Sequence, residues 1–144
     1  MWRCTGRDTR ETKESLILTL HRRVAVSDGS LEHVQSVQLS PHAADYGAEI
    51  VLGAGGEHVY ATSRGSGMVL VYQIEQEDRL VKVQEFYLGG TWPRHFAIKE
   101  DIMVVADQMG NSVQLVNINK DTGMLSGEDM VWIGNQPTFV CFVD

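Results

Sequence analysis

The sequence predicts an all-β fold, a β-propeller of which this chain supplies about two and a half four-stranded blades. Three observations lead to this prediction: an internal repeat of about 44 residues, four short β-rich runs in each copy, and turn-forming residues between the runs. A β-sandwich also contains short strands, but it gives no reason for a repeat of this length. The repeat therefore favours the propeller.

The repeat emerges when the chain is aligned with itself. Tyr60 pairs with Val104 and Pro93 pairs with Pro137, and the members of both pairs are 44 residues apart. The first pair lies in an apolar run that ends in polar residues and a turn, and the second follows a turn that contains glycine. The same supersecondary unit is therefore predicted twice.

Each copy of the repeat is expected to form four strands joined by tight turns. The expected strands cover residues 48–52, 58–63, 69–74 and 80–87 in the first copy, and 95–98, 102–108, 112–118 and 125–132 in the second. The breaks carry Gly55-Gly56, Gly65-Ser66-Gly67, Gly110-Asn111 and Asp121-Thr122-Gly123. These residues supply the positive φ angles that hairpins require.

The two ends of the chain differ in how well they fit the repeat. Residues 24–37 predict a strand, a turn and a strand, and residues 139–143 predict one further strand. Residues 1–20 match nothing in the repeat, and their charged composition predicts a poorly ordered leader in which 16–20 form a short helix or strand. The predicted division is a leader (1–20) and a propeller part (21–144), which comprises a half blade (21–40), a blade (45–90), a blade (91–134) and the innermost strand of a next blade (137–143).

The composition and the net charge of the chain limit the classes of partner that it is expected to bind. The formal net charge is −7 and the longest basic run is Arg22-Arg23, which argues against binding to nucleic acid. The chain lacks an apolar run long enough to span a bilayer, and its first residues lack the apolar core of a secretory signal. Two cysteines, Cys4 and Cys141, make no disulfide framework. We therefore expect a cytoplasmic protein that binds neither nucleic acid nor a membrane.

Three segments carry a resemblance to a known family. They are Gly47-Ala48-Glu49-Ile50, the run from His58 to Gly65, and the run from Gly89 to Ala97. With residues 104–108 and 121–125, they resemble the seven-bladed lactonase family, which includes bacterial 6-phosphogluconolactonases and fungal carboxymuconate-lactonizing enzymes. The Trp-Pro-Arg-His-Phe element after two glycines is the most specific part, and the resemblance covers roughly residues 24–142.

The resemblance implies a hydrolase that opens a lactone ring without a cofactor or a metal. It implies a small anionic lactone as the substrate, either 6-phosphogluconolactone, in carbohydrate metabolism and the pentose phosphate pathway, or a lactone of the carboxymuconolactone type. Because the family ring has seven blades, we expect this chain to be a C-terminal fragment that is inactive by itself.

Position in the repeat selects the candidate site residues. Propeller ligands usually lie at one mouth of the central channel, where innermost strands and loops converge. Glu49 begins the innermost strand of the first copy, and Arg94 and His95 begin that of the second. Lactone hydrolysis needs a base to activate water, and an anionic substrate needs arginine to bind it. The resemblance gives Glu49 as the catalytic base or acid and Arg94 as the catalytic clamp, with His95 and Arg64 as weaker, substrate-binding candidates.

Each of these residues also has a structural interpretation. Glu49 fits a solvated carboxylate at a strand end, and Arg94 fits an ion pair with a neighbouring blade. His95 fits a packed strand residue, and Arg64 fits a cap of the hairpin that follows it. The five histidines show no metal-ligand spacing, so no metal site is predicted. Residues 53–56 are predicted as a hairpin turn rather than a phosphate loop, because no helix follows them.

Two classes of function remain open at this point. The first is a lactonase, in an assembly or a longer chain that completes the ring. The second is a non-catalytic fragment or interaction module. Open blade faces would be apolar, so the second class predicts self-association through them.

Overall fold

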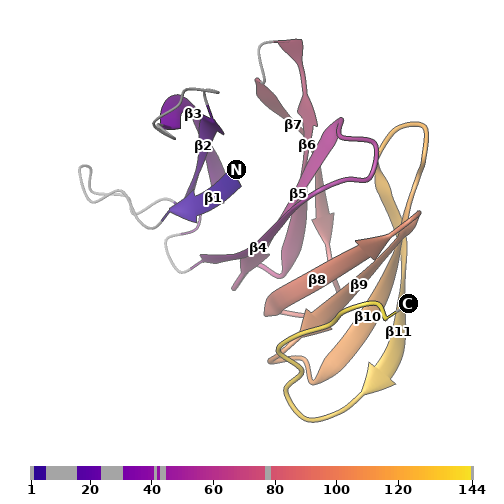
Figure 1. Ribbon diagram of the computed structural model, residues 1–144. Helices are drawn as coiled ribbons and strands as arrows, with labels where there is room; N and C mark the ends of the chain where they lie inside the picture. The colour runs from indigo at the N-terminus through magenta and orange to yellow at the C-terminus, as the bar shows by residue number, and fades with distance from the viewer. Residues whose placement is uncertain are drawn as a thin grey trace.

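The computed structural model describes residues 2–5, 16–23, 31–40, 42, 45–76 and 79–143, and within these ranges the regular structure is β (Figure 1). The strands are β1 (Trp2–Thr5), β2 (Leu16–Arg23), β3 (Leu31–Ser40), β4 (Tyr46–Leu52), β5 (His58–Arg64), β6 (Met68–Ile74), β7 (Leu80–Tyr87), β8 (Pro93–Lys99), β9 (Ile102–Asp107), β10 (Ser112–Ile118) and β11 (Leu125–Ile133). They form three antiparallel sheets. The prediction of an all-β fold is confirmed. Among the described residues, no helix is long and apolar enough to cross a membrane.

Two of the sheets have the same four-stranded construction. One has the order β4-β5-β6-β7 and the other the order β8-β9-β10-β11, so each strand pairs with its neighbours in the chain. The strands expected for both copies of the repeat are all present. Tight turns join the strands, with positive φ at Gly56, Gly65, Gly67 and Gly123. A repeated four-stranded meander is the unit expected of a propeller.

The N-terminal sheet differs from the expected half blade. It has three strands in the order β1-β2-β3, and β2 pairs with β3 from Leu16 to Arg23. Within the expected leader, residues 16–20 form a strand, which is one of the two alternatives predicted for that run, and β1 at 2–5 is a strand that the sequence did not predict. The apolar run that begins β2 pairs on both of its edges. Residues 6–15 lie outside the described residues, and so do residues 24–30, the first part of the strand, turn and strand predicted over 24–37.

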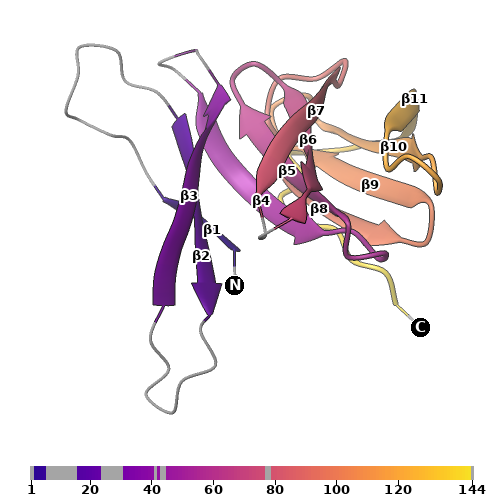
Figure 2. The same cartoon turned by 90° about the horizontal axis from the view of Figure 1, so that it is seen from above.

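The core lies between neighbouring sheets, which stand side by side in both views (Figures 1 and 2). β6 illustrates the packing, since its first five residues are all buried. Successive side chains of a strand point to opposite faces. Met68, Leu70 and Tyr72 therefore join the cluster that contains Leu39 of β3. Val69 and Val71 join a second cluster that contains Phe96 of β8.

The C-terminal residues do not form the expected strand. Residues 136–143 are outside any strand, although their backbone passes beside the start of β8. A β-strand needs a sheet edge to which its N–H and C=O groups can bond. In each four-stranded sheet the first strand pairs with the strand that follows it in the chain, and the described residues contain no strand after β11.

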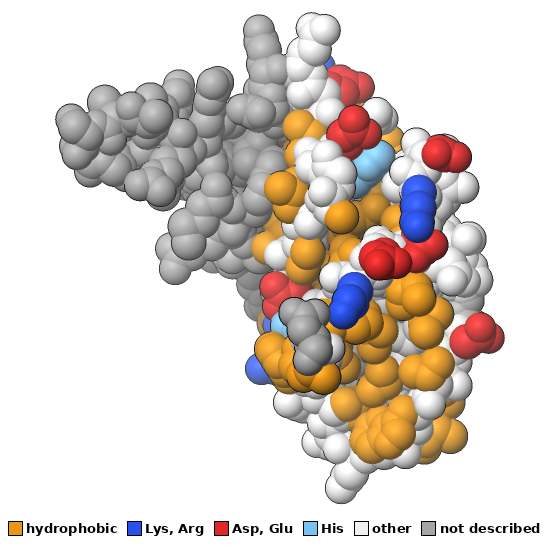
Figure 3. Space-filling view, turned by 45° about the vertical axis from the view of Figure 1, so that its right-hand side comes forward, with side chains coloured by type: hydrophobic (Ala, Val, Ile, Leu, Met, Phe, Trp, Pro, Cys, Tyr) orange, Lys and Arg blue, Asp and Glu red, His pale blue; other side chains and the backbone are white. Residues whose placement is uncertain are grey.

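The last sheet ends in an apolar surface. Met130, Trp132 and Ile133 of β11 are exposed by 59%, 49% and 77%. Figure 3 shows hydrophobic side chains gathered over this part of the molecule. In the first copy of the repeat, the residue that matches Trp132 is Phe86, because Phe86 pairs with Val69 of β6 as Trp132 pairs with Val113 of β10. Phe86 is partly buried and packs against the core between the two four-stranded sheets. The same position is thus covered in one sheet and uncovered in the next.

Candidate functional site

A β-bulge occurs at the start of each innermost strand. In β4, Gly47 pairs with Ser63 and Ile50 pairs with Ala61, which leaves one residue extra on β4. In β8 the extra residue is Arg94. Bulges bend a strand locally and redirect its side chains, and they are frequent beside active sites. Both bulges lie at the same end of the two sheets.

The structure brings all four predicted site residues together. They line one open pocket of about 350 Å³ between the starts of β4 and β8, where the C-terminal segment forms another wall. The lining residues are Gly47, Ala48, Glu49, Arg64, Arg94, His95, Thr138 and Phe139. Residues from four separate parts of the sequence therefore share one site.

Glu49 is held by its own strand pair and faces His95. Its backbone N–H donates to Thr62 Oγ1 at 3.0 Å, and its Oε1 accepts from the Ile50 N–H at 3.3 Å. Its Oε2 lies 3.5 Å from His95 Nε2. The Glu49 side chain is 34% exposed, so it is in contact with solvent but is not a freely solvated carboxylate.

His95 is enclosed more fully than Glu49. Its side chain is 20% exposed, and its ring lies against Phe139 with the centroids 4.2 Å apart. The Val140 N–H donates to His95 Nδ1 at 3.4 Å. His95 is therefore packed, as its structural interpretation predicted, and it also faces the carboxylate of Glu49.

Arg64 lies across the start of β4 and does not cap the hairpin that follows it. Its guanidinium donates to the Gly47 carbonyl at 2.9 Å and lies over the rings of Tyr46 and Trp92, at 5.7 Å and 5.6 Å from their centroids. Burial and the like charge of Arg94 lower the pKa of Arg64 from its ordinary value, against an opposing effect of Tyr46. The two guanidinium groups therefore make this mouth of the pocket locally positive, in an acidic chain.

Sequence reasoning missed a buried carboxylate, Asp45, just before β4. It accepts hydrogen bonds from Ser40 Oγ at 2.5 Å, Ser63 Oγ at 3.1 Å and the Ser66 N–H at 2.9 Å. Burial alone would raise the pKa of Asp45, but the hydrogen bonds from Ser40, Ser66 and Ser63 outweigh it and hold the pKa below its ordinary value. Asp45 thereby ties the segment before β4 to the β5–β6 hairpin.

A second buried carboxylate, Asp107, anchors the loop that leads into β8, the strand that contains Arg94. Its Oδ1 accepts from the Trp92 N–H at 2.8 Å, and the residue is 1% exposed. Gly90 and Gly110 leave it room, because an added Cβ would lie 1.7 Å and 1.8 Å from Asp107 Oδ2. Sequence reasoning missed Asp107 as well, because the position 44 residues earlier is Ser63, so no carboxylate recurs with the repeat.

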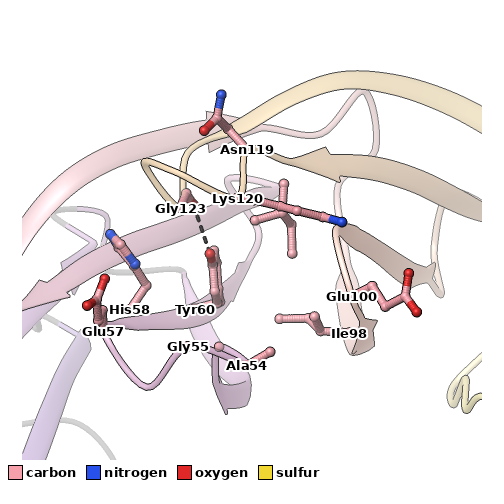
Figure 4. Close-up of a pocket in the computed structure, with 12 residues that line it drawn as sticks. Ala54, Gly55, Glu57, His58, Tyr60, Ile98, Glu100, Asn119, Lys120 and Gly123 are labelled. Carbon is pink, nitrogen blue, oxygen red and sulfur yellow. Dashed lines mark hydrogen bonds between the residues drawn. The ribbon is translucent and has the colours of Figure 1, made fainter.

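A different pocket opens at the other end of the two sheets (Figure 4). It also has a volume of about 350 Å³, and turns at the far ends of the strands form it. Tyr60 stands in its centre and donates its hydroxyl proton to the Gly123 carbonyl at 2.8 Å. Burial raises the pKa of Tyr60. None of the predicted site residues lines this pocket.

Comparison with known proteins agrees with the sheet architecture. A family model described as "Lactonase, 7-bladed beta-propeller" matches residues 13–142. The 6-phosphogluconolactonase of Enterobacter sp. (strain 638) is 26% identical over 120 residues, which cover 78% of this chain and 36% of that protein. The 6-phosphogluconolactonase of Cronobacter sakazakii is 26% identical over 125 residues, which cover 81% of this chain and 37% of that protein. The chain thus spans little more than a third of the length of these relatives.

Solved structures give the same architecture. The periplasmic gluconolactonase of Pseudomonas aeruginosa superposes with a TM-score of 0.80 at 19% identity, over 89% of this chain and 37% of that one. A putative 6-phosphogluconolactonase of Bacteroides uniformis superposes with a TM-score of 0.70 at 24% identity, over 90% of this chain and 37% of that one. At these identities the likeness concerns the fold.

Proposed function

Because the chain belongs to the seven-bladed β-propeller lactonase family, we propose that it carries part of the active site of a lactone hydrolase. One observation supports this most directly. Glu49 of β4, Arg64 of β5, and Arg94 and His95 of β8 line a single pocket. A carboxylate and two guanidinium groups at one mouth are the groups that hydrolysis of an anionic lactone requires.

In the proposed mechanism, Glu49 is the general base. It takes a proton from water, whose oxygen forms a bond to the lactone carbonyl carbon. The carbonyl oxygen becomes an oxyanion, and the guanidinium of Arg94 stabilises this charge. The bond between the carbonyl carbon and the ring oxygen then breaks, and the proton passes from Glu49 to the leaving alkoxide. The products are a hydroxyl group and a carboxylic acid, which releases its proton to solvent and becomes a carboxylate.

The proposed substrate is a sugar lactone that carries a phosphate, of the 6-phosphogluconolactone type. Two observations support an anionic substrate in this pocket. The positive charge of Arg94 acts on Arg64, so two guanidinium groups are available to bind an anion, and the relatives in Enterobacter and Cronobacter are named 6-phosphogluconolactonases. Arginine binds phosphate and carboxylate in the same bidentate manner, so a lactone of the carboxymuconolactone type is the alternative. We place this reaction in the pentose phosphate pathway of the cytoplasm, which agrees with the exposed, free thiol of Cys141.

A graft tests the proposal. Residues 13–142 replace the matching third of the Enterobacter 6-phosphogluconolactonase, so that a whole ring is present. We expect the graft to hydrolyse 6-phosphogluconolactone and the isolated chain not to do so. A folded graft without activity would refute the proposed function, and normal turnover by the isolated chain would refute its dependence on further blades.

A second candidate function is a binding module, and the apolar surface of β11 supports it. Met130 and Trp132 are exposed, whereas Phe86, which matches Trp132 in the first copy of the repeat, packs against the core between the sheets. We propose that the isolated chain self-associates through this surface, because a sheet of the same construction would cover it. Light scattering of the purified chain should then give a mass of two or more times the 16.0 kDa of one chain. A monomer at every concentration would refute self-association.

A further inference from the structure

The two ring nitrogens of His95 lie in different surroundings. The Val140 N–H donates to Nδ1 at 3.4 Å, and Nε2 lies 3.5 Å from Glu49 Oε2. Phe139 packs on the ring with an angle of 38° between the two planes. The ring is thus held by the C-terminal segment, and one nitrogen faces the carboxylate.

These contacts determine which nitrogen of the neutral ring carries the proton. A neutral imidazole has one N–H donor and one nitrogen with a free lone pair. The Val140 amide can only donate, so Nδ1 must supply the lone pair and Nε2 must carry the proton. The Nε2–H then faces Glu49, which can only accept. Arg64 and Arg94, the other charged residues of this pocket, are donors and offer Nε2–H no competing acceptor.

We infer that His95 is a positioning residue for Glu49, and that the Val140 amide selects the tautomer that allows this. The inference rests on the proposed role of Glu49 as the base. A base needs a free lone pair, and the Val140 amide occupies the single lone pair of His95. Glu49 retains acceptor capacity beyond its bond from the Ile50 N–H, because each carboxylate oxygen has two lone pairs.

The arrangement gives the C-terminal segment a part in the site. Residues 138–139 line the pocket, and the next amide contacts the imidazole. A segment outside any strand therefore sets the hydrogen-bonding pattern of a residue on β8. A base that is oriented by a neutral donor keeps one geometry relative to the water it activates.

Nuclear magnetic resonance of the ¹⁵N-labelled full chain tests the inference directly. Long-range ¹H–¹⁵N correlation spectra at about pH 8, where an ordinary histidine is neutral, report the tautomer. His95→Gln identifies the His95 signals by their loss. We expect one protonated Nε2 and one unprotonated Nδ1. A protonated Nδ1, or the averaged pair of signals of a free imidazole, would overturn the inference.

A pair of variants tests the role of the Val140 amide. Val140→Pro removes the N–H, so the His95 signals should move toward the averaged pair, whereas Val140→Ala keeps the N–H and should keep the wild-type signals. Unchanged signals in Val140→Pro would show that another group selects the tautomer. These spectra need no substrate. If the graft is inactive while the spectra still show a single His95 tautomer with the proton on Nε2, the result contradicts the proposed function and not the inference about the tautomer.

Discussion

Glu49 and His95 occupy equivalent places in two successive sheets. Glu49 lies in the bulge of β4 opposite Thr62, and His95 lies in the bulge of β8 opposite Ala106. Thr62 and Ala106 are 44 residues apart, so one repeated position supplies both the carboxylate and the imidazole. The two groups approach to 3.5 Å. A repeated backbone irregularity thus turns neighbouring blades toward a common site.

Replacement of Glu49 should remove turnover without unfolding the graft. Glu49→Gln keeps the shape of the side chain but loses the basic oxygen, so we expect kcat for 6-phosphogluconolactone to fall by about 10²- to 10⁴-fold. The matched control is Glu75→Gln, an exposed glutamate at the far end of the sheet, which should keep wild-type turnover. Equal rates in both variants would remove Glu49 from the mechanism.

Arg64 should contribute to stability as well as to binding. Its guanidinium bonds the Gly47 carbonyl and lies over two rings, so Arg64→Ala should lower the free energy of unfolding by about 1–3 kcal/mol. Arg64→Lys keeps the charge but loses the planar group, and it should recover only part of this loss. Urea denaturation measures both, with Arg79→Ala, an exposed arginine, as the control. Full recovery in the lysine variant would assign the effect to charge alone.

The room around Asp107 should tolerate no added methyl group. Gly110→Ala would place a Cβ 1.8 Å from Asp107 Oδ2, so the carboxylate must move and the free energy of unfolding should fall by about 1–3 kcal/mol. Gly55→Ala is the matched control, because its Cβ would meet nothing within 4 Å. Denaturation midpoints that shift equally in the two variants would contradict the role of Asp107.

Asp45 should make the fold sensitive to acid. Its pKa in the folded chain lies below the ordinary 3.8, so the folded state binds this proton more weakly than the unfolded chain does. The stabilisation is therefore complete above the unfolded pKa and is lost as the pH falls through the folded one. Asp45→Asn should be less stable at neutral pH and should lose this part of the acid dependence. Urea midpoints between about pH 6 and pH 3 measure it, and parallel curves for the two proteins would refute it.

The surface of β11 should control assembly. Trp132→Glu places a charge in the uncovered apolar position, so we expect the self-associated species to be lost. Tyr87→Glu, at an exposed position at the end of β7, is the control that should leave assembly unchanged. Light scattering distinguishes the two. Assembly that survives Trp132→Glu would locate the contact elsewhere.

Periodicity explains why the two full sheets were predictable from the sequence. Apolar runs such as those around Tyr60 and Val104 record strands that are buried on both faces, and glycines mark the turns between them. Glu49, Arg94 and His95 could be found because they lie near the starts of innermost strands, and Arg64 because it lies at the same mouth. The carboxylates of Asp45 and Asp107 were missed because a buried aspartate has no periodic signature; its partners, such as Ser40 and Ser63, are spread along the chain.

The ends of the chain were less predictable, because pairing there depends on distant partners. β2 forms a strand because β1 and β3 flank it, a fact that its own short apolar run does not encode. The C-terminal segment has the sequence of an innermost strand, but the described residues contain no following strand with which it could pair as β4 pairs with β5. In both cases the local sequence is compatible with a strand, and the availability of a neighbouring edge decides the outcome.

Residues of β6 belong to two hydrophobic clusters at once, so the stabilities of the two clusters are coupled. Met68, Leu70 and Tyr72 serve one core and Val69 and Val71 the other, so neither can loosen without releasing the strand that the other needs. The two cores should consequently melt in a single transition. The amide protons of β6 should be among the last to exchange with heavy water, at rates set by global unfolding.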